Sequence, residues 1–582
     1  MVLDPPLDRP SGRLLDPPLE PPQSGISASP ELKLTPGEIT LGLFLVTVAV
    51  TVRFFALFQQ IPMLDEWHAL VRTAQYGFRA IASSLGVNDH SIPWTLYLEL
   101  VDRTVGINEY WFFAPGAIAS LAFALALPLA LRREIGTGVA WFWAALLASS
   151  PTLIYYAREA RPYGFTALLA PLAVVLWQRA TTAAGTRRDG IGFVAATALV
   201  GWSLAPHLPF ILAPVAVVVF WSSPGRAPFR SRLLLALTAG CTLLLLLGPP
   251  VFLDAKSVGF RVGMAVKQGW SLTGLVPLRL FSMQSIWPPI AMLGIAWLGT
   301  RQWARARRGE GPGPGMRPGT ISLLGIAATA QIAAVALVRP YGTDSEIVFA
   351  RYVLPVLPVL LLAVAQGLTW LAGRSVDRRF VTGTICSAVV AVQLVCSPLP
   401  TIFRIPNNFG DYSRGAQPPP RVFFLEPQLE GRISNQVLSA FYRQRRLEPH
   451  GSSAIIEAPY TGFVSLPYRE FQVHHRQIVI GGLLPPDCEP SRYVGDGLLP
   501  TTVRNFRYLV DLTDREAVRR KKADWLVLHR SPRSNPRFPR VEDDVQGFDF
   551  EKCAAFLEAL YGKPIVDKKT GLIFDLRSAA KG

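Results

Sequence analysis

Long apolar runs separated by short polar loops occupy most of the first 400 residues. A helix that crosses a bilayer needs about 20 predominantly apolar residues, and eleven runs approach or reach that length. They lie near 38–58, 110–130, 138–156, 163–178, 190–205, 208–221, 233–252, 284–300, 319–338, 352–372 and 380–400. The pattern predicts an α-helical polytopic membrane protein with about eleven transmembrane helices, and a re-entrant or interfacial helix over 270–281.

The composition changes before and after this region. Residues 1–37 are rich in proline and lack the basic start and apolar core of a signal peptide, which predicts a disordered tail. Residues 401–420 form a polar linker, and residues 421–582 carry short elements of their own. Strands are expected over 454–458, 477–481 and 524–529, and helices over 435–446 and 550–561. Alternating strands and helices predict a small C-terminal α/β domain.

The basic residues indicate the orientation in the membrane. With the N-terminus in the cytoplasm, the cytoplasmic loops hold 16 Lys and Arg in 54 residues, against 11 in 107 residues of the outer loops. The domain 38–400 is therefore expected to span a cytoplasmic (inner) membrane, with the C-terminal domain on the extracytoplasmic side. Since topology explains much of the net charge of +17, we expect no nucleic acid as a partner.

The five cysteines divide between the two regions. Three lie in apolar runs and are interpreted as packing residues, while Cys488 and Cys553 lie in the soluble domain and can pair in an oxidising compartment. Sequence alone leaves that pairing open. No Cys or His cluster predicts a metal site, and a requirement for a divalent metal stays open.

An acidic pair follows the first apolar run. Asp65 and Glu66 open a stretch over 67–78 that reads as an amphipathic interfacial helix, with Trp67 and Leu70 among its expected anchors. One interpretation is that the pair caps this helix and complements its dipole. The other is that a carboxylate at the boundary of water and lipid acts as a general base.

Several arginines on the outer side oppose the positive-inside bias. Arg158 and Arg161 follow the third span, and Arg351 is expected to open the tenth. They are either anchors that reach to the interface beside tyrosines, or ligands of a phosphate group, which suits the planar guanidinium. His90 is either incidental or a further donor to that phosphate. Arg53, near the outer end of the first span, reads as a snorkelling residue.

Four short motifs together resemble the GT-C membrane glycosyltransferases. They are Leu64-Asp-Glu, His90-Ser-Ile-Pro-Trp, Tyr155-Tyr-Ala-Arg-Glu-Ala-Arg-Pro-Tyr and Arg351-Tyr-Val-Leu-Pro. The resemblance is to the family-39 type, the relatives of protein mannosyltransferases and of the lipid A aminoarabinose transferase, and it covers roughly residues 38–400. One proline is displaced after His90, and Arg161-Pro-Tyr replaces the family's frequent Arg-Met-Tyr. The end of the soluble domain, 557–566, resembles the family more weakly.

The resemblance implies a reaction. The donor is a sugar on a polyprenyl phosphate, and the acceptor is a hydroxyl of an envelope glycan, lipid or protein. Asp65 takes the acceptor's proton, and Glu66 orients Asp65 or the acceptor. Arg158, Arg161, Arg351 and His90 bind the donor phosphate, and Tyr163 and Tyr352 line the substrate pocket. Direct attack inverts the anomeric carbon, and no acid is needed because phosphate leaves unaided.

Two further functions fit the same spans. A transporter or flippase for lipid-linked saccharides also needs outer cations, but it predicts charges in mid-membrane or inverted repeats. The other is a non-catalytic envelope-assembly scaffold. Only loss of transfer on replacement of Asp65 would distinguish the enzyme from such a scaffold. Two clusters of the soluble domain are interpreted as solvated: the pair His474-His475, and the basic run 519–522, for which contact with anionic lipid or glycan is the secondary interpretation.

Overall fold

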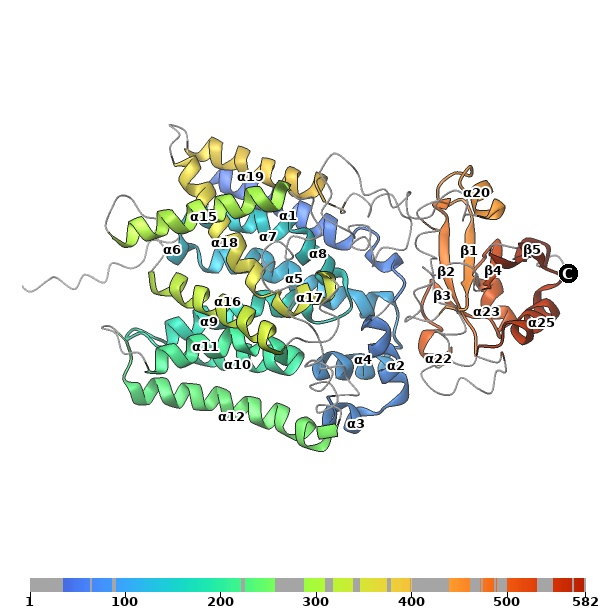
Figure 1. Ribbon diagram of the computed structural model, residues 1–582, viewed down its shortest axis with the longest axis horizontal. Coiled ribbons are helices and arrows are strands. Elements are labelled where there is room, and N and C mark those ends of the chain that lie inside the picture. The colour runs from blue at the N-terminus through green and yellow to red at the C-terminus, as the bar shows by residue number, and fades with distance from the viewer. Residues whose placement is uncertain are drawn as a thin grey trace, which may run out of the picture.

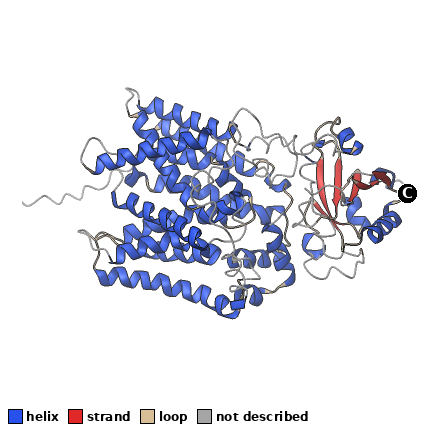
Figure 2. Cartoon of the chain, in the orientation of Figure 1, coloured by secondary structure: helices blue, strands red, loops and turns tan. Residues whose placement is uncertain are grey.

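A computed structural model gives the structure of the chain (Figure 1), which consists of a helical bundle and a smaller domain that carries all the described strands (Figure 2). The structure describes residues 35–62, 65–85, 91–220, 226–256, 287–308, 318–338, 346–373, 378–397, 399, 439–460, 472, 475–485, 488, 500–530, 548–567 and 570–579. The chain is thus an α-helical polytopic membrane protein with a C-terminal α/β domain, as the hydrophobic pattern predicts.

Each of the eleven apolar runs contains a helix or a pair of helices. The bundle helices are α1 (Pro36–Phe54), α5 (Glu109–Ala130), α7 (Thr137–Ser149), α8 (Pro151–Arg158), α9 (Tyr163–Ala180), α10 (Arg187–Leu204), α11 (Leu208–Phe220), α12 (Phe229–Leu253), α15 (Trp287–Arg307), α16 (Pro318–Val338), α18 (Val356–Ala372) and α19 (Arg378–Val395). Shorter helices connect them: η1 (Leu57–Gln59), α2 (Asp65–Gln75), α3 (Phe78–Ser83), α4 (Ile92–Thr104), α6 (Arg132–Ile135), η2 (Ala205–His207) and α17 (Glu346–Val353). The expected helix over 270–281 lies outside the described residues.

The first helix shows how local sequence sets a boundary. Thr35 accepts a hydrogen bond from the Glu38 amide, Glu38 bonds back to the Thr35 amide, and Pro36 occupies the first turn. This capping box satisfies main-chain donors that have no partner inside the helix.

The third apolar run is broken at Ser150. Its hydroxyl caps α8, Pro151 follows at the first helical position, and α8 departs from α7 at 53°. Proline cannot continue the hydrogen-bond ladder of α7, so a new helix begins there.

By length and composition, five helical segments among the described residues can cross a membrane, or six if the bent pair α7–α8 is one span. One of the five joins α10, η2 and α11. The isolated β-bridge between Thr182 and Arg226 places the start of α10 beside the end of α11, so these two helices form a hairpin rather than one long span. The remaining apolar helices are shorter, and the total of about eleven spans stays a prediction.

The segments that connect the bundle helices lie at its two ends. At one end, Arg132 reaches Glu38, and Arg179 forms an ion pair with Glu134. At the other end lie α2, α3 and α4, next to the C-terminal domain (Figure 1). Which end faces the cytoplasm stays a prediction.

The C-terminal domain is built on a six-stranded sheet in the order β3-β2-β1-β4-β6-β5. Its strands are β1 (Ala454–Ala458), β2 (Ile478–Leu483), β3 (Leu509–Asp511), β4 (Trp525–His529), β5 (Ile565–Asp567) and β6 (Gly571–Asp575). Its helices are α20 (Ala440–Arg445), α22 (Pro500–Val503), α23 (Arg515–Arg520), α25 (Phe550–Tyr561) and α26 (Leu576–Ala579). The first four strands are parallel, and β6 and β5 are antiparallel additions.

The two parts of the chain meet through specific contacts. The Tyr460 hydroxyl donates to the Pro62 carbonyl over 2.8 Å, and its ring meets Trp67 edge-on at 5.7 Å. The buried Glu109 carboxylate accepts hydrogen bonds from the amides of Arg507 and Tyr508. The sheet domain is therefore held against the end of the bundle that carries α2, α3 and α4, which is the predicted outer end. The predicted domain limits at 37, 400 and 420 stay predictions, because 1–34 and 400–438 lie outside the described residues.

The expected lipid anchors of α2 are wrong. Trp67, Leu70 and Val71 are buried in an apolar cluster that includes α4 and residues of the sheet domain. Amphipathic periodicity marks a helix that buries one face, but it does not distinguish a protein surface from a membrane surface. The helix α2 is covered by protein.

Cys488 and Cys553 form a disulfide that closes a loop of 65 residues. In the chain-entropy model a loop of this length is stabilised by about 4 kcal/mol, so the double change Cys488→Ser, Cys553→Ser should make the domain unfold at markedly lower urea concentration. Proteolysis of the full chain in detergent across a urea series measures this. Cys241→Ser, at an exposed free cysteine, is the control, and an unshifted domain would contradict the pairing.

Candidate functional site

The acidic pair lies where the first loop begins its helix. Asp65 is the first residue of α2, and its side chain lies outside the description. Glu66 is 4 % exposed, and its Oε1 accepts a hydrogen bond of 2.6 Å from the amide of Ala160. The carboxylate of Glu66 therefore fixes the turn that carries Asp65 to the segment between α8 and α9, which carries Arg161 and directly follows Arg158, the last residue of α8.

Arg158 closes the end of the first helix. Its Nη1 donates to the carbonyl groups of Val52, Arg53 and Phe55 over 3.3, 3.0 and 2.8 Å, and its Nε donates to Gln60. The last carbonyl groups of a helix have no partner within it, and a buried arginine supplies donors for them. Arg158 therefore has a structural role, because it satisfies the carbonyl groups at the end of α1.

Arg53 does not reach to the membrane surface. It is fully buried, and it donates to the carbonyl groups of Leu147 and Ala148 over 3.1 and 2.7 Å, at the end of α7. The prediction of a snorkelling residue is wrong, because the side chain turns into the bundle to supply the donors that α7 lacks. Arg53 caps α7 while Arg158 caps the helix that carries Arg53.

The second arginine of the motif is buried. Arg161 is 1 % exposed, in the short turn that precedes α9. Tyr163, the first residue of α9, is also buried and meets the ring of Tyr156 edge-on at 5.5 Å. A β-carbon at Gly164 would approach the Ala157 backbone to 2.9 Å, so glycine is what allows α9 to lie so close to α8.

Arg351 belongs to a different element from the one expected. It lies in the last turn of α17, separate from α18, so the prediction that it opens the tenth span is wrong. Leu354 and Pro355 separate the two helices, and proline at that point favours a break. Nη2 of Arg351 bonds the Tyr352 hydroxyl over 3.1 Å, and the guanidinium lies 5.0 Å from the centre of that ring.

Two polar residues hold this helix end in place. Nε2 of His207 donates to the carbonyl of Arg351 over 2.8 Å, and Gln331 donates to the carbonyl of Tyr352 over 2.7 Å. These two bonds fix the end of α17 to η2 and α16.

The structure thus joins Glu66 to the segment that follows Arg158, and it places Arg351 against Tyr352. His90 lies outside the described residues, so its role stays a prediction. Sequence reasoning missed Gln60, His207 and Gln331. The signal for Gln331 and His207 was a polar residue inside or between apolar runs, where burial requires a hydrogen-bond partner.

In the described part of the chain, no three His, Cys, Asp or Glu side chains lie close enough together to hold a metal ion. The buried His475 stacks on Tyr442 at 5.3 Å, so the prediction of a solvated histidine pair is wrong for this member. His474 lies outside the described residues.

Comparison with known proteins gives a likeness in structure and none in sequence. The sequence matches no protein-family model and no curated protein. Among solved structures, the chain is similar to the crystal structure of ArnT from Cupriavidus metallidurans bound to undecaprenyl phosphate. The identity is 13%, the match covers 91% of this chain and 97% of that chain, and the TM-score is 0.41. At this level the likeness says nothing about the site or the chemistry of this chain.

Replacing Arg158 by methionine tests its structural duty. The change leaves the carbonyl groups of Val52, Arg53 and Phe55 without this donor in a buried place, which should destabilise the protein by about 2–5 kcal/mol. The measurement is the temperature at which the detergent-solubilised protein loses its monodisperse peak.

Arg520→Met is the control. Arg520 and its ion-pair partner Glu516 on α23 are both largely exposed, so loss of Arg520 should cost at most about 1 kcal/mol. Equal melting temperatures for the two variants would contradict the capping role of Arg158.

Proposed function

We propose that the chain is an inverting glycosyltransferase that moves a sugar from a polyprenyl-phosphate-linked donor to an acceptor hydroxyl at the outer face of the membrane. The observation that carries the proposal is the hydrogen bond between Glu66 and Ala160, which joins the acidic turn to the arginine-bearing segment. The motif resemblance of the same two stretches to GT-C glycosyltransferases supports the same assignment.

The proposed reaction forms one bond and breaks one. The acceptor oxygen attacks the anomeric carbon, its proton passes to Asp65, and the bond from that carbon to the phosphate oxygen breaks. The lipid phosphate then carries an additional negative charge. Glu66 acts as a positioning residue, because its carboxylate is bonded to the main chain and holds the turn of Asp65.

The proposed phosphate ligands are Arg351 and Arg161, with His90 as a further donor. Arg351 is partly exposed and its main chain is held by His207, so its charge is fixed before the substrate arrives. Fixed cations stabilise charge that develops in a transition state without reorganisation. Arg158 is assigned a structural role beside these ligands, because its donors bind carbonyl groups at the end of α1.

The tyrosines complete the proposed pocket. Tyr163 is buried beside Tyr156, and Tyr352 lies against Arg351. We place this site on the extracytoplasmic side, with the sheet domain above it. The disulfide between Cys488 and Cys553 supports that side, because such bonds persist in oxidising compartments. The acceptor is a hydroxyl of an envelope glycan, lipid or protein.

Asp65→Asn tests the base. Loss of the proton acceptor should reduce transfer by about 10²–10⁴-fold. The measurement is a mass-spectrometric inventory of envelope glycans in a deletion strain that expresses wild-type or Asp65→Asn protein. Wild type should restore one sugar on one glycan, and the variant should not.

The control is Glu558→Gln, on an exposed face of α25, at matched protein levels. This variant should restore the glycan fully. Full restoration by Asp65→Asn would exclude the proposed base and favour the helix-cap interpretation or the scaffold.

Arg351→Gln tests the phosphate ligand. It should reduce transfer by about 10²–10³-fold, since one fixed donor to developing charge is lost. Its melting temperature should stay near that of wild type, because Arg351 is partly exposed and its main-chain contacts remain. Arg351→Lys should recover part of the rate. A variant that melts early and loses activity in proportion would point to a structural role instead.

A further inference from the structure

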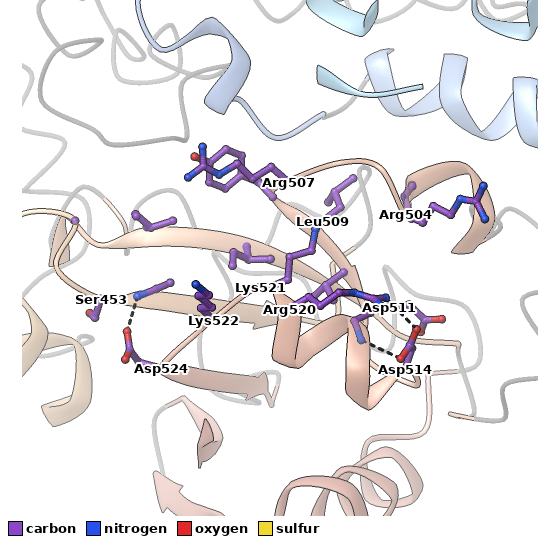
Figure 3. Close-up of a pocket in the computed structure, with 18 of the residues that line it drawn as sticks. Ser453, Arg504, Arg507, Leu509, Asp511, Asp514, Arg520, Lys521, Lys522 and Asp524 are labelled. Carbon is purple, nitrogen blue, oxygen red and sulfur yellow. Dashed lines mark hydrogen bonds and ion pairs between the residues drawn. The ribbon is translucent and has the colours of Figure 1, made fainter. Parts of the chain in front are cut away.

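A second chemically distinctive place lies in the sheet domain, away from the residues above. A pocket of about 860 Å³ opens beside the amino ends of the parallel strands β1 and β2, between the strand β3 and the helix α23. Its floor is apolar, with Ile478, Ile480 and Leu509 among its residues. Figure 3 shows charged side chains of α23 and its flanking turns around this space. The volume falls in the range of small-molecule sites.

Positive charge exceeds negative charge around the pocket. Five cationic side chains line it, against three carboxylates. The cations are Arg504, Arg507, Arg520, Lys521 and Lys522. The run at 519–522 was expected to be a solvated helix face. That prediction is wrong for Lys521, which is half-buried and donates to the carbonyl of Phe506.

The carboxylates already hold the main chain. Asp524 accepts from the amide of Ala454 over 2.9 Å, Asp514 caps α23 by accepting from Ala517 over 2.9 Å, and Asp511 accepts from the amide of Thr513. An ionised carboxylate has about four acceptor positions, so Asp524 can accept from hydroxyl groups of a ligand as well as from the amide of Ala454.

The cations are less compensated. Arg520 forms ion pairs with Glu516 and Asp514 at 3.2 and 3.9 Å. Among the residues that the structure describes, the nitrogen atoms of Arg504, Lys521 and Lys522 form no ion pair with a carboxylate. Burial lowers the pKa of Lys521, the neighbouring Arg520 and Arg507 act in the same direction, and the Glu109 carboxylate opposes the shift. A negatively charged ligand would add to the compensation that Glu109 gives Lys521 and Asp102 gives Arg504.

The pocket also adjoins the membrane part. Its wall at Arg507 and Tyr508 donates main-chain hydrogen bonds to Glu109, the first residue of α5, and Phe506 meets Phe112 at 5.8 Å. The same segment thus lines the pocket on one side and is fixed to the bundle on the other. A ligand bound here would lie at the junction between the soluble domain and the membrane surface.

We infer that this pocket binds an anionic saccharide, through a phosphate or carboxylate group on the cations and hydroxyl groups on the carboxylates. Arg504 and Lys522 bind the negatively charged group, and Asp524 accepts hydrogen bonds from the hydroxyl groups. This deepens the proposed function, because an anionic acceptor glycan held here would be retained beside the outer end of the bundle. The pocket is a binding site, and the bond-forming step belongs to the Asp65 region.

The test uses the full chain in phosphatidylcholine nanodiscs, which carry no net lipid charge. The probes are glucose 1-phosphate, glucuronate and glucose, and binding is measured by saturation-transfer NMR. At least one anionic probe should bind, glucose should bind at least tenfold more weakly, and the double variant Arg504→Gln, Lys522→Gln should weaken anion binding at least tenfold.

Arg519→Gln is the matched control, since Arg519 lies on α23 outside the pocket and is exposed. It should leave anion binding within twofold of wild type. Failure of both anionic probes to bind wild type, equal binding by the double variant, or equal loss in Arg519→Gln would each overturn the inference.

The variant Asp65→Asn separates this inference from the proposed function. It should bind the anionic probe as wild type does while failing in transfer. Full transfer by Asp65→Asn together with charge-dependent binding would refute the proposed base and leave the pocket standing. If the anionic probes do not bind while transfer depends fully on Asp65, the inference about the pocket is wrong and the proposed base stands.

Discussion

The outer end of the bundle depends on satisfying main-chain carbonyl groups where helices stop inside the protein. A helix leaves its last carbonyl groups unpaired, and in a membrane protein no water reaches the buried ones. Here Arg53 of α1 donates to Leu147 and Ala148 of α7, and Arg158 donates to Val52 and Arg53. Each arginine completes a helix other than its own. The chain can therefore end α1 and α7 within the bundle and still turn sharply into new segments.

This arrangement determines where the acidic turn lies. Because Arg158 fixes the end of α1 and Gln60 bonds to the main chain of Arg158, the start of the first loop is tied to α8. Glu66 then bonds Ala160, two residues further along the same segment. Tyr460 and Glu109 fasten the sheet domain to the same end. The position of Asp65 thus follows from a chain of buried hydrogen bonds, which a rigid site requires.

Local periodicity predicted the elements, and it failed where the answer depended on distant partners. The strand at 454–458 and the helix at 550–561 lie where the sequence placed them, because alternation and caps are local signals. Arg53 and Trp67 were assigned to the membrane surface, yet both are buried against residues about 95 or more positions away. Spacing along one segment does not reveal which surface will cover it. The first and third motifs of the sequence nevertheless lie on segments that meet, through the bond between Glu66 and Ala160.

The same contacts bear on the alternative of a transporter. Alternating access moves one group of helices past another, and its ionisable residues line the path of the substrate. In the described part of the bundle, Arg53 and Arg158 are buried charges of this kind, but their donors reach main-chain carbonyl groups of neighbouring helices. Sliding those helices apart would leave both the carbonyl groups and the guanidinium groups unsatisfied at a cost of several kcal/mol. These buried arginines hold the helices of the outer end in one arrangement. A fixed arrangement favours a reaction that needs its carboxylate and cations at fixed positions.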